Sequence, residues 1–253
     1  MILDLFRLSG KNALVTGSSS GLGAAIAVAF AEAGANVALH GSQFVPDAVV
    51  DRVAATGVQY VALAADLRHP DRCPELIAQT VAALGSIDIL VNNAGMIRRA
   101  PAVDFTAVDW DEVLAANLTS VFRLSQSAGR HMLAQGSGKI VNIASLLSFQ
   151  GGVRVPSYAA AKGGVAQLTK ALANEWAAQG VQVNAIAPGY METDNTEALR
   201  NDPVRSRQIL ERIPAARWGS SQDVAGAAVF LASPASDYIN GHILAVDGGW
   251  LGR

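Results

Sequence analysis

The chain contains a single cysteine, few aromatic residues (6%) and few charged residues (16%). With Cys73 alone, no disulfide can form within the chain, which favours a reducing compartment such as the cytoplasm. Cys73 precedes Pro74 among charged residues, and we expect an incidental thiol and not a nucleophile. The histidines lack the paired spacing of metal ligands, so no metal site is predicted. They are His40, His69, His131 and His242.

The sequence also lacks long apolar runs and clusters of basic residues. No stretch approaches the ~18 unbroken apolar residues of a membrane span. The first six residues are too few, and carry an acid too early, for a secretory signal. Lys+Arg 19 against Asp+Glu 21 gives a net charge of −2, without a basic run of the kind that binds nucleic acid. The sequence therefore predicts a cytoplasmic protein with neither nucleic acid nor membrane among its partners.

Short apolar runs alternate with longer helical stretches along the chain. Seven runs are apolar throughout, as expected of parallel strands covered on both faces: Asn12–Thr16, Asn36–His40, Val58–Ala64, Ile87–Val91, Lys139–Ala144, Val181–Ala187 and His242–Val246. Six stretches are expected to be helices: Leu22–Ala33, Asp47–Ala55, Asp71–Leu84, Asp109–Gln135, Pro156–Gln179 and Ser221–Ala232. The alternation predicts one α/β domain over residues 1–253, with a Rossmann-like doubly wound parallel sheet between helices. The irregular stretch Gly189–Arg217 is a candidate lid.

A glycine-rich segment joins the first predicted strand to the first predicted helix. Residues 16–23 read Thr-Gly-Ser-Ser-Ser-Gly-Leu-Gly. Glycines there permit a tight turn and let backbone N–H groups approach a pyrophosphate at the start of a helix. A plain strand-to-helix turn could use the same glycines, but the flanking strand and helix favour a nucleotide-binding loop.

Tyr158 and Lys162 are four residues apart, which places both side chains on one face of a helix. An ammonium beside a phenol stabilises the phenolate, so we expect a lowered pKa for Tyr158 and proton exchange with a substrate oxygen near neutral pH. Ser145 ends a predicted strand. Its hydroxyl could stabilise oxyanion character on the substrate, or it could be a turn residue.

Together these motifs resemble the short-chain dehydrogenase/reductase family from about residue 8 to the C-terminus. The other matching segments are Asn92-Asn93-Ala94-Gly95 and Pro188-Gly189 followed by Thr193. The resemblance implies an oxidoreductase that uses NAD(H) or NADP(H) on a secondary alcohol or ketone. It also implies a homotetramer formed through the helices expected at Asp109–Gln135 and Pro156–Gln179. Candidate interface residues, which could equally face the sheet, are Leu114, Val121, Leu124, Val165 and Leu168.

The resemblance also implies which residues bind the dinucleotide. They are Gly17, Ser19, Ser20, Gly21, Leu22, Gly23, His40, Gly41, Ser42, Asp66, Leu67, Asn93, Ala94, Gly95, Tyr158, Lys162, Pro188, Gly189 and Thr193. Gly41 occupies the position of the acidic residue that favours NAD in the family. Neither a carboxylate nor an arginine is present there, so the choice of cofactor stays open, and Ser42 could donate to a 2′-phosphate. His40 either contacts the adenosine or has no role, and Asp66 either contacts the adenine or caps a helix.

Asn117 completes the catalytic set that the resemblance implies: Asn117, Ser145, Tyr158 and Lys162. Asparagine is unfavourable inside a helix. In the family this residue binds a water that links the lysine to solvent; alternatively, a buried asparagine only kinks the helix. Because oxidation releases a proton, we expect oxidation to be faster at alkaline pH and reduction to prefer neutral or acid pH.

Four further segments resemble the branch of the family that acts on deoxy-keto sugar acids: residues 96–99, 146–157, 187–196 and 246–253. Substrate contacts are predicted for Arg98, Ser145, Gln150, Arg154 and Tyr158. Arg154 would pair with a carboxylate and Gln150 with a hydroxyl. Arg99 follows Arg98 near the same crevice, and the arginines could instead be surface residues. Similarly, Trp218 and Trp250 could line the pocket or serve packing.

Other functions stay open at this level. A reductase of another carbonyl, such as a polyol, a different keto acid or a 3-oxoacyl thioester, would need the same catalytic residues. A cofactor-binding protein without catalysis is disfavoured by the complete catalytic set.

Overall fold

A seven-stranded parallel sheet forms the centre of the computed structural model, which describes residues 1–253 apart from the side chain of Asn195. The strand order is β3-β2-β1-β4-β5-β6-β7. The strands are β1 (Asn12–Val15), β2 (Asn36–Gly41), β3 (Tyr60–Ala64), β4 (Ile89–Asn92), β5 (Gly138–Ile143), β6 (Val181–Pro188) and β7 (Ile243–Val246). The predicted doubly wound sheet is confirmed, and each predicted strand agrees with an observed one to within about two residues at either end.

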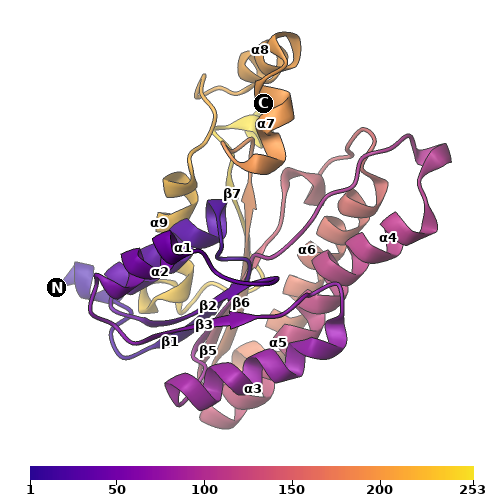
Figure 1. The fold of residues 1–253 in the computed structure, drawn as a ribbon. Helices are drawn as coiled ribbons and strands as arrows, with labels where there is room; N and C mark the ends of the chain where they lie inside the picture. The colour runs from indigo at the N-terminus through magenta and orange to yellow at the C-terminus, as the bar shows by residue number, and fades with distance from the viewer.

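Helices cover both faces of the sheet (Figure 1). On one face, α1 (Gly21–Glu32), α2 (Asp47–Ala54) and α9 (Ser221–Ala232) bury an aliphatic core around Phe30. On the other, α3 (Cys73–Leu84), α5 (Ser120–Gln135) and α6 (Pro156–Trp176) enclose a second core around Met132 and Trp176. Cys73 belongs to this second core, where burial raises the pKa of its thiol to about 12. A buried, protonated thiol fits the incidental role expected for it.

Two sequence expectations about the layers need correction. The edge strand β3 alternates between exposed and half-buried residues, because only its inner neighbour and one helix layer cover it. In addition, the helix expected at Asp109–Gln135 is divided. It consists of α4 (Ala107–Leu114), a π-helical turn (Ala115–Thr119) and α5. Of the candidate interface residues, Val121, Leu124 and Val165 are buried within the chain, whereas Leu114 and Leu168 are half-buried.

The stretch Gly189–Arg217 contains two helices that the sequence did not reveal, α7 (Glu197–Arg200) and α8 (Pro203–Arg212). They form the lobe beside the C-terminus at the top of Figure 1. This lobe has a small core of its own, which joins α8 to the chain end and to the loop after β5: Leu146, Ile209, Ile213, Trp218 and Trp250. Among the described residues no helix is both long and apolar enough to cross a membrane.

Candidate active site

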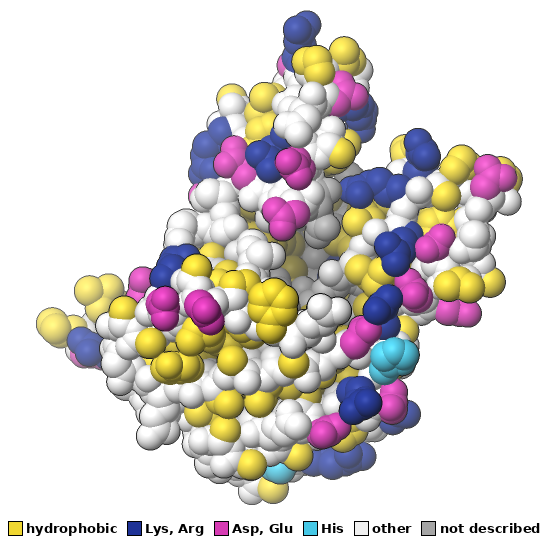
Figure 2. Space-filling model, in the orientation of Figure 1, with side chains coloured by type: hydrophobic (Ala, Val, Ile, Leu, Met, Phe, Trp, Pro, Cys, Tyr) yellow, Lys and Arg dark blue, Asp and Glu magenta, His cyan; other side chains and the backbone are white. Residues whose placement is uncertain are grey.

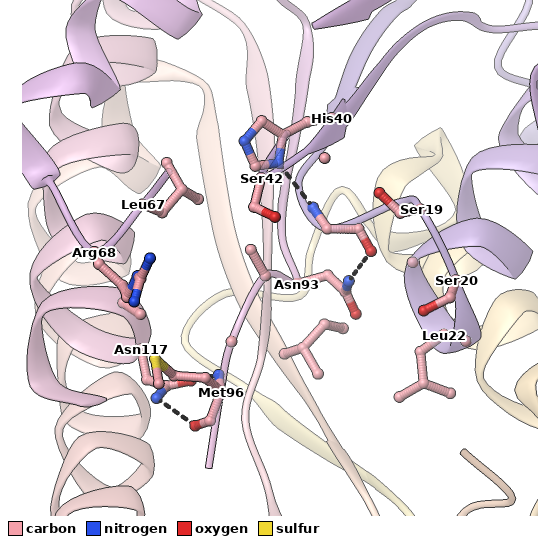
Figure 3. Close-up of a pocket in the computed structure, with 18 of the residues that line it drawn as sticks. Ser19, Ser20, Leu22, His40, Ser42, Leu67, Arg68, Asn93, Met96 and Asn117 are labelled. Atoms are coloured by element: carbon pink, nitrogen blue, oxygen red, sulfur yellow. Dashed lines mark hydrogen bonds between the residues drawn. The ribbon is translucent and has the colours of Figure 1, made fainter. Parts of the chain in front are cut away.

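A cavity of about 510 Å³ opens at the carboxyl ends of the strands (Figure 3). Parallel strands bring the loops that follow them to this edge of the sheet, where α/β proteins bind ligands. Eighteen of the predicted site residues line it: Gly17, Ser19, Ser20, Gly21, Leu22, Gly23, His40, Gly41, Ser42, Asp66, Leu67, Asn93, Ala94, Gly95, Asn117, Tyr158, Lys162 and Thr193. In the space-filling view, the molecule is hollowed between the α7–α8 lobe and the α4–α6 side, with basic side chains near both rims (Figure 2).

The phosphate end of the cavity is made of backbone. Helix α1 starts at Gly21, and the side chain of Ser20 does not cap it, so its first N–H groups face the cavity without a side-chain partner. A Cβ on Gly17 would lie 2.8 Å from Ala94 Cα, and one on Gly23 would overlap the Gly17 carbonyl oxygen. Asn93 Nδ2 donates to the carbonyls of Thr16 (2.9 Å) and Gly17 (3.0 Å). These donors and this cradle fit a dinucleotide pyrophosphate.

The end of β2 approaches the glycine loop closely. His40 is 2% exposed, and its Nδ1 lies 3.0 Å from the Gly17 nitrogen while its Nε2 lies 2.9 Å from the Ala65 carbonyl oxygen. Both ring nitrogens therefore have backbone partners. The sequence had suggested either a contact with the adenosine or no role for His40, and it did not predict these two backbone contacts. A Cβ on Gly41 would overlap the Phe44 carbonyl oxygen and lie 2.5 Å from Ser19 Oγ. The tight turn after β2 thus accounts for the missing carboxylate at Gly41.

Asp66 and Arg68 form the wall after β3. Asp66 accepts hydrogen bonds from the Arg68 backbone (3.0 Å) and guanidinium (2.7 Å), and the side-chain bond is the main cause of the lowered pKa of Asp66. Asp66 therefore closes a local turn and does not cap a helix. Arg68 also reaches Glu112 at 3.4 Å. Sequence reasoning missed Arg68, although a cation two residues after the family-matched aspartate was the available signal.

Asn117 occupies the π-helical turn, where the widened backbone ring turns its amide toward the strand end. Asn117 Oδ1 accepts from the Met96 N–H (3.0 Å), and Nδ2 donates to the carbonyls of Met96 (2.8 Å) and Val113 (2.9 Å). A Cβ on Gly95 would overlap the Asn117 side chain. The residue therefore fastens the segment after β4 to the α4–α5 junction. Of the two roles weighed for Asn117, the water link to the lysine stays a prediction, and a break in helix regularity is observed. The hydrogen bonds to Met96 were not predicted.

Ser145, Tyr158 and Lys162 come together where β5 meets α6. Ser145 Oγ accepts from the Leu147 N–H (3.2 Å), and the Ser145 hydroxyl acts to lower the pKa of the nearby Tyr158 phenol. Lys162 Nζ donates to the Ile143 carbonyl (2.5 Å) and lies 5.6 Å from the centre of the Tyr158 ring. Helix α6 starts with Pro156, whose missing N–H costs nothing at that position. Tyr158 and Lys162 therefore lie on one face of α6, as their spacing in the sequence predicted.

The electrostatics of the pair differ from the sequence expectation. Burial raises the pKa of Tyr158, opposed by the Ser145 hydrogen bond and by the positive charge of Arg99. Burial also lowers the pKa of Lys162 to about 8. The expected lowering of the Tyr158 pKa by Lys162 is therefore wrong for this arrangement, because Nζ is directed at the Ile143 carbonyl and desolvation dominates.

Three of the side chains predicted to bind the substrate lie outside the main cavity. Arg98 pairs with Asp109 (3.2 Å) and Glu112 (3.0 Å) of α4. Gln150 Oε1 accepts from the Trp250 indole N–H (3.1 Å), so it fastens the chain end. Arg154 is exposed, with a left-handed φ of 64°. None of these three side chains lines the main cavity among the described residues.

Several site residues fall elsewhere or were not anticipated. Pro188 and Gly189 end β6 beside β7, with the Gly189 N–H donating to the Val246 carbonyl at 2.9 Å, and they do not line the main cavity. Met96 and Asp194 do line it, without having been predicted. Trp250 is packed against Tyr190 (4.7 Å between ring centres) and Arg212 (4.0 Å), so packing is its role. No cluster of potential metal ligands occurs in the described part of the chain.

Comparison with known proteins places this arrangement. Residues 17–251 match the family model described as enoyl-(acyl carrier protein) reductase. The chain is 54% identical to 2-dehydro-3-deoxy-D-gluconate 5-dehydrogenase of Escherichia coli (strain K12), over 100% of both chains. A crystal structure from Agrobacterium tumefaciens with bound NADP, proposed to be a 2-deoxy-D-gluconate 3-dehydrogenase, has 58% identity and a TM-score of 0.93, covering 98% of this chain and 99% of that one.

A gluconate 5-dehydrogenase from Burkholderia cenocepacia J2315, in complex with NADP and tartrate, is 41% identical with a TM-score of 0.94 over 100% of both chains. Fold and sequence agree across these comparisons. The chain belongs to the short-chain dehydrogenase/reductase family.

Proposed function

We propose that the protein is an NAD(P)-dependent dehydrogenase that interconverts a secondary alcohol and a ketone on a deoxy-keto sugar acid, with 2-dehydro-3-deoxy-D-gluconate as the substrate. The observation that carries this proposal is the meeting of Ser145, Tyr158 and Lys162, of which Tyr158 and Lys162 line a dinucleotide-sized cavity. The likeness to sugar-acid dehydrogenases over the whole chain supports the substrate class.

The cofactor supplies or accepts the hydride when it is bound, and the protein handles the proton. Tyr158 exchanges a proton with the substrate oxygen, donating it in reduction and accepting it in oxidation. The Ser145 hydroxyl, which accepts from the Leu147 N–H, keeps its own proton available for that oxygen. Lys162, whose Nζ lies 5.6 Å from the centre of the phenol ring and donates to the Ile143 carbonyl, is proposed to orient this end of the site.

Arg99 is the proposed anchor for the substrate carboxylate. Its positive charge opposes the rise in the Tyr158 pKa, which supports a place near the phenol. Its neighbour Arg98 is directed to Asp109 and Glu112 of α4. The Ala100 N–H donates to the Arg154 carbonyl (3.1 Å), which holds the two loops together around this region. An arginine pairs with a carboxylate through two parallel hydrogen bonds. This assigns to Arg99 the role that the sequence had offered to Arg98 and Arg154.

The segment 189–217 is proposed as the lid over the substrate. Thr193 and Asp194 at its start line the cavity, and its helices rest on the small core around Trp250.

We also propose that the protein is a cytoplasmic homotetramer. Phe122, 38% exposed on α5, could contact a second subunit. Light scattering on the purified protein measures the mass, and a monomer at every concentration would contradict the assembly.

The decisive experiment follows the absorbance of the reduced nicotinamide with a panel of ketones, using NADH and then NADPH. The panel holds deoxy-keto sugar acids, neutral ketoses and 3-oxoacyl thioesters. Turnover confined to the sugar acids is the expected result. Turnover of thioesters alone would shift the function toward the acyl chemistry in the matched family model's description. No turnover, with cofactor bound, would favour a non-catalytic protein.

The substitution Arg99→Ala tests the substrate class directly. Losing a charge-assisted pair to a carboxylate is expected to raise KM for a sugar acid about 10- to 100-fold. KM for a neutral ketose should change far less. Arg98→Ala is the matched control, because this neighbouring arginine already pairs with α4. Equal effects of Arg99→Ala on both substrates would remove the carboxylate argument.

A further inference from the structure

The end of β2 is fastened to the glycine loop by four hydrogen bonds of His40, the longest of them from Ser18 Oγ to the His40 carbonyl at 3.4 Å. The Gly17 N–H donates to the imidazole, and the Ser18 N–H donates to the His40 carbonyl (2.8 Å). In return, the His40 N–H donates to Ser18 Oγ (2.8 Å). Figure 3 shows the ring between the end of β2 and the loop, with the dashed line from Nδ1 marking the bond from the Gly17 N–H.

The partners of the ring fix its protonation state. A carbonyl oxygen only accepts, so the Nε2 that faces Ala65 at 2.9 Å must carry the proton. A backbone N–H only donates, so the Nδ1 that faces Gly17 at 3.0 Å must be unprotonated. The neutral imidazole with the proton on Nε2 satisfies both partners. A second proton would set an N–H on Nδ1 against the Gly17 N–H.

Those two partners belong to opposite walls of the cavity. Gly17 begins the loop that leads to the helix N-terminus, and Ala65 begins the wall that continues through Asp66. The imidazole bridges these walls from behind and is itself 2% exposed. Its position therefore sets the spacing between the segment that begins at Gly17 and the segment that begins at Ala65.

We propose that neutral His40 is a positioning residue for the ADP half of the cofactor, and that protonation of its Nδ1 loosens the glycine loop and weakens dinucleotide binding. The inference rests on the dinucleotide site proposed above. It assigns to this histidine a function that acts through its hydrogen bonds to the backbone of the two walls.

The surroundings keep His40 neutral under ordinary conditions. The charged side chains that line the same cavity are Asp66 and Arg68, which pair with each other, and Asp194 and Lys162. None of these is among the causes that move the pKa of His40, which burial lowers from 6.5 against an opposing contribution from the Ala65 carbonyl. The folded protein thus takes up this proton only below the pH at which the unfolded chain does. Stability from the neutral ring is complete above about pH 6.5 and decreases as the pH falls toward the folded-state pKa.

The test compares two variants in which a side-chain amide replaces the imidazole and keeps one of its two backbone contacts. His40→Asn retains an acceptor at the position of Nδ1 for Gly17, and His40→Gln retains a donor at the position of Nε2 for Ala65. Neither amide titrates. The probe is ADP-ribose, which carries the ADP half without the reactive ring and without a 2′-phosphate that would itself titrate. Calorimetry gives its Kd between about pH 5 and pH 8.

The native protein should lose affinity for ADP-ribose by up to about tenfold per pH unit below the folded pKa of His40. His40→Asn should bind within about threefold of the native protein at neutral pH and show a flat profile, because the Gly17 bond survives. His40→Gln should bind about tenfold more weakly throughout, because a buried N–H loses its acceptor. Thermal unfolding of each variant checks that it is folded.

An equally steep acid loss in native protein and His40→Asn would overturn the proposal, as would equal affinities of His40→Gln and native protein at neutral pH. A different result, no binding of ADP-ribose by folded native protein at any pH, would instead count against the dinucleotide site itself. The two proposals therefore fail in distinguishable ways.

Discussion

The dinucleotide end and the substrate end of the cleft are held together by different kinds of contact. At the dinucleotide end, glycines and strand ends meet through backbone atoms, as Gly17, Gly23 and Ala94 do. At the end proposed for the substrate, side chains from distant parts of the chain meet, as in the bond between Gln150 and Trp250. A backbone cradle follows from local sequence motifs, whereas a side-chain scaffold depends on pairings that no local pattern shows.

The largest expected effect lies where the two ends meet, at Tyr158. Removing the phenol oxygen with Tyr158→Phe eliminates the proton donor and acceptor, so kcat should fall about 10²- to 10⁴-fold. The Kd for ADP-ribose should change little, because that ligand does not extend to the catalytic end. Tyr238→Phe, at a fully exposed tyrosine, is the matched control. A Tyr158→Phe variant with more than a tenth of the native kcat would contradict the acid–base role.

The backbone cradle gives the next largest effect. Gly17→Ala combines a left-handed φ of 64° with a Cβ placed 2.8 Å from Ala94 Cα, and the displaced atoms are backbone. We expect about 2–4 kcal/mol of lost stability and about 10- to 100-fold weaker ADP-ribose binding. Gly136→Ala has a similar φ of 69° but open space around its Cβ, so it should cost about 1 kcal/mol and leave binding unchanged. Equal effects of the two would show that conformation alone, and not the close approach, matters.

The contrast between the two ends also explains what the sequence could predict. The sheet and the glycine loop were predictable because apolar runs, helix ends and glycine spacing are local signals. The residues of the loop line the cavity as expected. The division of the long helix at Asn117 was visible only as an unfavourable residue, and nothing in the sequence indicated its hydrogen bonds to Met96.

For the residues predicted near the substrate, the sequence showed the chemical type of each side chain but not the partner with which it would pair. Gln150 and Trp250 are 100 residues apart, and nothing in either segment predicts their hydrogen bond. Arg98 and Arg99 are adjacent and chemically identical. Only the position of α4 decides that Arg98 pairs with Asp109 and Glu112. The direction of the Tyr158 pKa was predicted wrongly, because desolvation depends on the whole fold and not on the spacing to Lys162.

The pH dependence of catalysis should separate the two directions of the reaction. Oxidation needs the phenolate of Tyr158, whose pKa is raised, so kcat/KM for oxidation should climb through the alkaline range, by at most about tenfold per pH unit. Reduction needs the phenol, so its rate should be level at neutral pH and fall only at strongly alkaline pH. Initial rates in both directions between about pH 6 and pH 10 provide the measurement. Oxidation that became steadily slower above about pH 7 would contradict Tyr158 as the base.

The smallest expected effect probes the side-chain scaffold by itself. Trp250→Phe keeps a ring against Tyr190 and Arg212 but removes the indole N–H that donates to Gln150 at 3.1 Å. One neutral hydrogen bond contributes about 0.5–1.5 kcal/mol, so KM for the sugar acid should rise a few-fold while the Kd for ADP-ribose is unchanged. Gln150→Leu should act similarly, and the double variant should be no worse than either single one, since both remove the same bond. Trp176→Phe, in the core beneath α6, loses an indole N–H bond to Glu175 without touching the lid. If Trp176→Phe raised KM as much as Trp250→Phe, the rise in KM would reflect a general loss of stability. The small core around Trp250 would then have no separate role in positioning the substrate.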